Sequence, residues 1–125
     1  MGTTFSANIL SQGRVRSDPR RKPALYRHRR KLDSIALGIG IAAFDELCDT
    51  EIRRSQRQEP ASAGVWLDIQ EALHALTSLL AEIESRRIRF GLLRNEHAEV
   101  AAELRDSIAF AKQAEPGDHF NFSLD

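Results

Sequence analysis

Residues 65–111 read VWLDIQEALHALTSLLAEIESRRIRFGLLRNEHAEVAAELRDSIAFA, and the spacing within this stretch decides the predicted fold. Large apolar residues recur at alternating steps of three and four, the spacing that keeps one face of an α-helix apolar. Arg87, Arg94 and His97 stand where an apolar residue is due, yet the phase continues beyond them. The pattern therefore predicts helix with a buried seam, formed by Trp66, Ile69, Leu73, Leu76, Leu80, Ile83, Phe90, Leu104 and Ile108.

The seam is compatible with one helix from about residue 63 to 113, or with two helices broken near Gly91. The segment RRIRFG, residues 86–91, has no proline and no turn dipeptide, and one glycine within a helix costs only about 1 kcal/mol. We therefore favour a continuous helix, whereas a break would give a three-helix bundle. A continuous helix would be about 75 Å long. Because the first helix could cover only half of it, we expect a homo-oligomer.

A first helix is expected from Asp33 or Ser34, either of which can serve as its N-cap, to about residue 58, before Pro60. Its first part, residues 35–44, is apolar on every side and so requires neighbours on every side. Gly38 and Gly40 favour close approach of another helix. A short connection at residues 59–64 makes the two helices an antiparallel hairpin. The predicted fold class is thus all-α, with coiled-coil packing along the seam.

The net charge of zero conceals a division along the chain. Residues 1–31 hold nine Arg or Lys and one acid, whereas residues 32–125 hold nine Arg or Lys and seventeen acids. Residues 1–31 also lack helical or strand periodicity, which predicts a flexible basic arm. We divide the chain into this arm, a helical domain of residues 32–115 and a tail of residues 116–125. The candidate binding residues of the arm are Arg14, Arg16, Arg20, Arg21, Lys22, Tyr26, Arg27, Arg29, Arg30 and Lys31.

Two kinds of target suit such an arm. Phosphate backbones attract flexible cations by counterion release, so one target is DNA or RNA. The other is an acidic protein surface, which arginine can contact in a bidentate manner. The chain also has an acidic face at helical spacing. That face is either solvated or receives the basic arm of the same chain or of a neighbour; its residues are Glu96, Glu99, Glu103 and Asp106.

The last residues of the chain suggest extended backbone. Phe120, Phe122 and Leu124 alternate with polar residues, as in a strand with one apolar face. Since we find no second candidate strand, we expect a short extended tail. The tail either folds back onto the helices or binds the sheet edge or groove of a partner.

Catalysis and metal binding find little support in the sequence. Cys48 is the single cysteine, which excludes an internal disulfide, and nearby acids and burial would raise the pKa of its thiol. Glu71 and His74 have the spacing of a di-iron ligand pair, but both lie opposite the seam. We expect no enzyme, no cofactor and no metal. A lone cysteine favours the cytoplasm, and no apolar run reaches the roughly eighteen residues that span a bilayer.

These observations predict a small non-enzymatic adaptor or assembly protein. It would dock onto protein components of a larger complex through the basic arm, the helical surface and the C-terminal tail. The alternative is a dimeric nucleic-acid-binding protein whose arm contacts the phosphate backbone.

Overall fold

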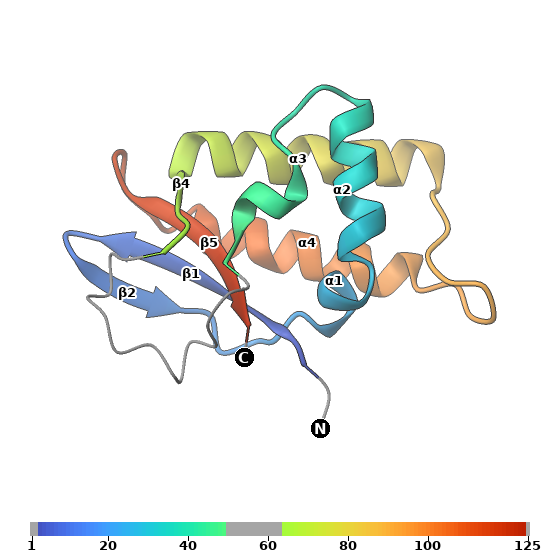
Figure 1. Cartoon of the computed structure of the whole chain (residues 1–125), viewed down its shortest axis with the longest axis horizontal. Helices are drawn as coiled ribbons and strands as arrows, with labels where there is room; N and C mark the ends of the chain where they lie inside the picture. The colour runs from blue at the N-terminus through green and yellow to red at the C-terminus, as the bar shows by residue number, and fades with distance from the viewer. Residues whose placement is uncertain (1–2, 50–63, 125) are drawn as a thin grey trace.

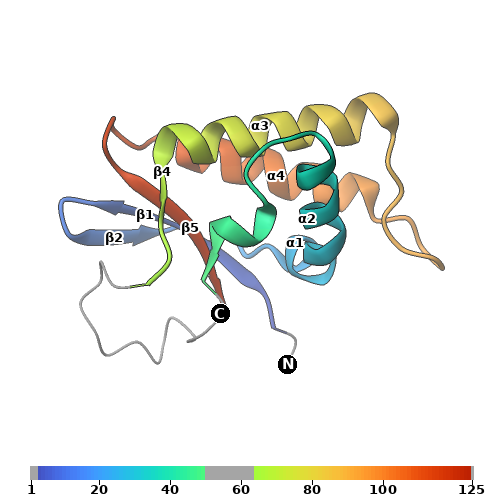
Figure 2. The same ribbon diagram turned by 45° about the horizontal axis from the view of Figure 1, so that its top comes forward.

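The computed structural model describes residues 3–49 and 64–124 and shows a mixed α/β fold (Figure 1). A five-stranded sheet forms one layer, and the long helices α3 and α4 lie side by side across one of its faces (Figure 2). The predicted all-α fold, with its helical bundle and coiled coil, is therefore wrong. The elements are β1 (Phe5–Ser11), β2 (Arg14–Ser17), α1 (Pro23–Arg27), α2 (Arg29–Gly38), the 3-10 helix η1 (Phe44–Leu47), β3 (Cys48–Asp49), β4 (Leu67–Asp68), α3 (Ile69–Arg86), α4 (His97–Ala111) and β5 (His119–Leu124).

Strand β5 lies at the centre of the sheet. It pairs antiparallel with β1, from Phe5 opposite Leu124 to Leu10 opposite His119. On the outer side of β1, β2 follows through a turn at residues 12 and 13, both of positive φ (52° and 77°). Such a turn has the twist that paired antiparallel strands require. The other side of β5 pairs with β3, which is parallel, and with β4, which is antiparallel.

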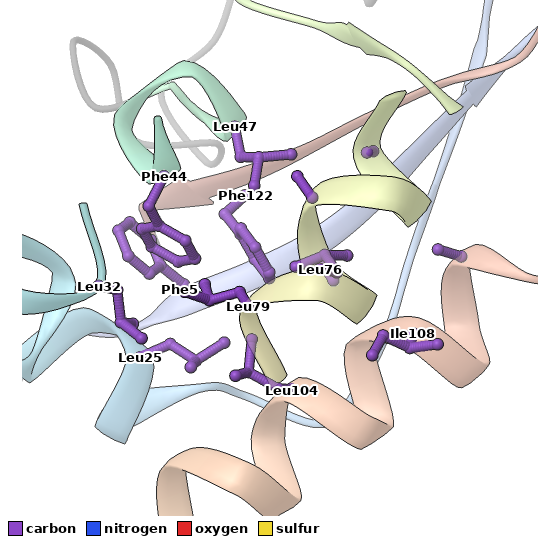
Figure 3. Close-up of a cluster of buried hydrophobic side chains, with 14 of the residues drawn as sticks. Phe5, Leu25, Leu32, Phe44, Leu47, Leu76, Leu79, Leu104, Ile108 and Phe122 are labelled. Atoms are coloured by element: carbon purple, nitrogen blue, oxygen red, sulfur yellow. The ribbon is translucent and has the colours of Figure 1, made fainter. Parts of the chain in front are cut away.

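The core lies between the sheet and the helices (Figure 3). All six phenylalanines of the chain are buried. The ring centroid of Phe122 lies 5.8 Å from that of Phe5 and 5.6 Å from that of Phe44. The seam residues contribute to the same core. Ile69, Leu76, Ile83, Phe90, Leu104 and Ile108 are buried, and Trp66, Leu73 and Leu80 are half-buried.

The predicted long helix is in fact two helices. α3 ends at Arg86 because Arg87 adopts the left-handed conformation, with φ of 50°. The chain turns again at Gly91 (φ 103°), where a side chain would collide with the carbonyl oxygen of Arg94. The apolar phase continues through this break because α3 and α4 both face the core. The length argument for a second chain no longer holds, and a homo-oligomer stays a prediction.

The first predicted helix is also wrong in extent. α2 begins at Arg29 and ends at Gly38, after which the chain forms η1 and β3. The apolar run of residues 35–44 thus covers the end of α2 and the connection to η1, and it does not continue as one helix of a hairpin. Among the helices of residues 3–49 and 64–124, none packs closely on Gly38 or Gly40, since a Cβ added at either would meet nothing within 4 Å. Residues 50–58 of the predicted helix, and Pro60, lie outside the described residues.

The expected flexible arm is folded wherever the structure describes it. Residues 5–31 form β1, β2, α1 and the start of α2. Local patterns did not predict β1 because its residues Ser6 and Asn8 have low β-propensity and face away from the helices. Asn8 is buried and donates to Asn121 Oδ1 at 2.8 Å and to Ser123 Oγ at 2.9 Å. These partners are more than 110 residues later in the chain, beyond the reach of local periodicity.

The expected C-terminal tail is the strand β5. The alternation of Phe120, Phe122 and Leu124 does indicate extended backbone, as β5 confirms. Phe120 and Phe122 are fully buried in the core of their own chain, as in the alternative in which the tail folds back.

Candidate functional site

The α3–α4 loop, residues 87–96, carries the two most exposed large apolar side chains among the described residues. Leu92 is 96% exposed and Leu93 is 103% exposed. The loop projects from the end of the molecule opposite the β1–β2 turn (Figure 1). Single exposed leucines are ordinary on protein surfaces, but two in succession at a projecting turn form an apolar tip.

Hydrogen bonds at the base of the loop hold it in place. Phe90 is fully buried, and its amide donates to Asn95 Oδ1 at 3.0 Å. The same oxygen accepts from the amide of His97 at 3.0 Å, at the start of α4. The amide of Glu96 donates to the carbonyl oxygen of Phe90 at 2.6 Å. The base of the loop is therefore a built turn anchored by one aromatic side chain.

The guanidinium of Arg89 secures the outer part of the loop. It donates to the carbonyl oxygens of Gly91 at 2.8 Å and Leu92 at 3.0 Å. Satisfied backbone carbonyls keep the loop in one conformation without packing of the leucine side chains. The leucines are thus presented to solvent by a framework that does not depend on them.

Cationic residues flank the two leucines. The Nζ atom of Lys31, on α2, donates to the carbonyl oxygen of Arg89 and lies 5.2 Å from the ring centroid of Phe90. This contact brings the basic end of α2 against the loop. We call the combined surface the leucine tip; it consists of Leu92, Leu93, Lys31, Arg86, Arg87, Arg89 and Arg94.

Glu96 joins three elements at the base of the leucine tip. Arg27 of α1 donates to its two carboxylate oxygens at 3.1 and 2.7 Å, and His28 Nε2 lies 2.8 Å away. Arg94 of the loop lies 3.4 Å from the same carboxylate. The hydrogen bonds from Arg27, and then from His28, lower the pKa of Glu96 to about 2. The carboxylate therefore stays ionised at neutral pH and fixes α1 to the start of α4.

The acidic face of α4 receives the basic segment of its own chain. Arg20 pairs with Asp106 at 3.2 Å. The carboxylate of Glu103 accepts from the amides of Ala24 (3.1 Å) and Leu25 (2.9 Å), in the first turn of α1. Burial raises the pKa of Glu103, although these two amides oppose the rise. The hypothesis that this face receives residues of the basic segment is confirmed, within one chain.

The basic residues that are neighbours in sequence separate in space. Lys22 is fully buried, with its Nζ atom 3.0 Å from Asp18 Oδ2. Arg14 and Arg16 lie on β2, at the end of the molecule opposite the leucine tip (Figure 1). The others occupy different surroundings: Arg20 and Arg27 on the acids of α4, Arg29 at 4.1 Å from the ring centroid of Tyr26, Arg21 exposed after β2, and Arg30 and Lys31 exposed on α2.

A pocket of about 360 Å³ lies between α2, η1 and the end of β5, and Cys48 contributes to its wall. Burial raises the pKa of the Cys48 thiol far above its ordinary value, and Asp45 and Asp33 raise it further. The thiol is therefore protonated at neutral pH, and a protonated thiol is a poor nucleophile.

The described part of the chain offers neither a metal-binding cluster nor a membrane-spanning helix. Within residues 3–49 and 64–124, no cluster of three or more His, Cys, Asp or Glu could hold a metal ion. Glu71 and His74 are exposed on α3. Among the helices of the same residues, none is long and apolar enough to cross a membrane.

Sequence reasoning did not single out Leu92 and Leu93. Both fall outside the phase of the seam, and they adjoin Gly91 between Arg89 and Arg94. The available signal for this exposed tip was a pair of successive leucines outside the phase of the seam, in a segment rich in arginine.

Comparisons with known proteins give no further guidance. No protein-family model, curated protein or solved structure matches this chain.

Proposed function

We propose that this protein is a non-enzymatic adaptor that docks onto an acidic protein partner through the leucine tip. The observation that carries the proposal is the near-complete exposure of Leu92 and Leu93 on a hydrogen-bonded loop. Burying a leucine side chain contributes roughly 1.5–3 kcal/mol. A loop that already holds its bound conformation loses little entropy on binding, so more of this energy becomes affinity.

The charges beside the leucines support an acidic partner. Four arginines of residues 86–94 and Lys31 lie in or against the loop. Arg86 and Arg94 pair with carboxylates of their own chain, whereas Arg89 and Lys31 donate to uncharged backbone carbonyl oxygens. Arginine is enriched among the residues that dominate binding energy at protein interfaces. A partner with an apolar pocket rimmed by carboxylates would complement both features.

Binding of DNA or RNA is the second candidate, and the arrangement of the cations favours it less. A phosphate backbone requires cations along a continuous track. Here Lys22 is buried, Arg20 and Arg27 pair with carboxylates, and Arg14 is on β2, which lies at the end of the molecule opposite the α3–α4 loop.

Two further expectations belong with this proposal. A cytoplasmic location rests on Cys48, a free and buried thiol, since lone cysteines are typical of reducing compartments. Self-association remains a prediction, and light scattering of the purified chain measures it.

The test compares capture of partner proteins by the natural chain and by the Leu92→Ser/Leu93→Ser double variant, with and without nuclease. Val65→Ser is the matched control, because Val65 is an exposed apolar residue near β4, away from the loop. We expect a partner that withstands nuclease, binds the control normally and binds the double variant at least about tenfold more weakly. Undiminished binding by the double variant would contradict the proposal. Binding that nuclease abolishes would favour the nucleic-acid alternative.

A further inference from the structure

A second apolar feature lies beside the leucine tip. A groove of about 310 Å³ runs between α2 and α3 and reaches the first residues of the α3–α4 loop. Ile35, Ile39 and Ile88 line it, and each is only half-buried. These three side chains therefore leave apolar surface in contact with water, which favours an occupant with apolar side chains of its own.

The groove is open along α2. Gly38 lines it, and a Cβ added there would meet nothing within 4 Å. The chain thus leaves space where an ordinary residue would place a side chain. Ile35 and Gly38 are three residues apart, so they lie on the same face of α2, next to Lys31 one turn earlier.

The borders of the groove carry mainly positive charge. Lys31 lies on the α2 side and Arg86 on the α3 side. The one acid in the lining, Glu82, pairs with Arg86 at 3.0 Å. Lys31 also contacts the α3–α4 loop through the carbonyl oxygen of Arg89, so the groove and the leucine tip form one continuous basic surface.

We infer that this groove binds one face of an acidic amphipathic helix of the partner protein. Apolar side chains at steps of three and four would cover the isoleucines, and flanking Glu or Asp would meet Lys31 and Arg86. An extended strand fits less well, because its backbone N–H and C=O groups would face the apolar lining unpaired. A second copy of this chain that docked groove to groove would bring the same positive charge against Lys31 and Arg86. The inference rests on the proposed function in taking the partner to be an acidic protein.

The test titrates the isotope-labelled full chain with a synthetic 18-residue helical peptide that has leucines on one face and glutamates on its flanks. A twin peptide with lysine in place of glutamate is the charge control. We expect the acidic peptide to shift the amide resonances of Ile35, Gly38, Ile39 and Ile88, and to bind at least about tenfold more tightly than its twin at low salt. Raising the salt should reduce this difference. Equal affinity for the two peptides, or shifts confined to other residues, would overturn the inference.

Two variants at one position separate blocking of the groove from damage to the fold. Gly38→Leu fills the groove, whereas Gly38→Ala adds one methyl group into open space, and both improve helix propensity. We expect Gly38→Leu to lower the affinity for the acidic peptide at least about tenfold, and Gly38→Ala to change this affinity little. Unchanged thermal unfolding of Gly38→Leu confirms that the fold is intact. Full binding by Gly38→Leu would refute the groove as the site, and concentration-dependent shifts without peptide would assign it to a second copy instead.

The same variants keep the two proposals apart. If Gly38→Leu binds the peptide normally while the Leu92→Ser/Leu93→Ser variant loses the native partner, the groove inference fails and the proposed function stands. If the peptide binds in the groove but the double variant retains the native partner, the proposed function fails and the groove inference stands.

Discussion

The two ends of this molecule treat large apolar side chains in opposite ways. Around β5 the chain buries the rings of Phe5, Phe44, Phe120 and Phe122, together with a charged pair and a network of asparagine and serine. At the α3–α4 loop it exposes two leucines almost completely. Because the chain has a core that buries many apolar side chains, lack of a core does not explain why these leucines are exposed. The contrast indicates that the sheet end provides stability, and it supports our proposal that the loop end binds a partner.

The largest expected effect on stability is at the centre of the sheet. Phe122→Ala removes a fully buried ring that contacts Phe5, Phe44 and Phe120, so we expect the free energy of unfolding to fall by about 3–5 kcal/mol. Urea denaturation measures this loss. Phe122→Leu, which keeps most of the volume, should cost about 1 kcal/mol. A loss below about 1 kcal/mol for Phe122→Ala would show that β5 is not the centre of the core.

The next effect concerns the buried charge. Lys22→Met removes the ammonium 3.0 Å from Asp18 and leaves that carboxylate only the guanidinium of Arg20, at 3.6 Å. We expect this change to cost about 3 kcal/mol in chemical denaturation. Adding Asp18→Asn should recover much of the loss, because no unpaired charge then remains. Equal stability of the single variant and the natural chain would mean that Lys22 reaches solvent.

A smaller effect is expected where α4 supports α1. Glu103→Ala removes the acceptor for the amides of Ala24 and Leu25, and the loss of such a cap costs about 1 kcal/mol. Thermal unfolding gives the measurement. Glu103→Gln keeps one acceptor oxygen but sets an NH2 group against the other amide, so we expect a smaller loss than for Glu103→Ala. Unchanged thermal unfolding of Glu103→Ala would show that these hydrogen bonds do not support α1.

The smallest expected effect on stability is at the leucine tip. Leu92→Ser with Leu93→Ser should change the free energy of unfolding by no more than about 0.5 kcal/mol, because neither side chain packs against the chain. Calorimetry of the purified variant checks this value. A large destabilisation would remove the contrast between the two ends, since the leucines would then serve the fold.

Local periodicity located the helices better than the sheet. The phase from Ile69 to Ile83 lies in α3, and Leu104 and Ile108 lie on the buried face of α4. Helical contacts repeat within one chain segment, so their spacing is visible in the sequence. The break between α3 and α4 was harder to predict, because it depends on Arg87 adopting a left-handed conformation for which the sequence shows no turn dipeptide.

The sheet required knowledge of distant partners. β1 pairs with β5 near the other end of the chain, and β2 contains two arginines that we had assigned to a flexible arm. Charge alone could not show that Lys22 is buried or that Arg27 pairs with Glu96. The leucine tip could not be predicted for the same reason. The exposure of Leu92 depends on hydrogen bonds from Arg89 and to Asn95 that fix the loop, and local periodicity does not show them.

The pairing of β1 with β5 has a consequence for how the protein is made. Residues 5–10 leave the ribosome more than 100 residues before their central partner strand, residues 119–124. Contacts of such long sequence separation slow folding, because a large loop must close before they form. Until residues 119–124 have been made, β1 can pair only with β2. A chain interrupted before Phe120 cannot complete its sheet, which leaves Phe5 and Ile9 exposed to proteases and to other unfinished chains.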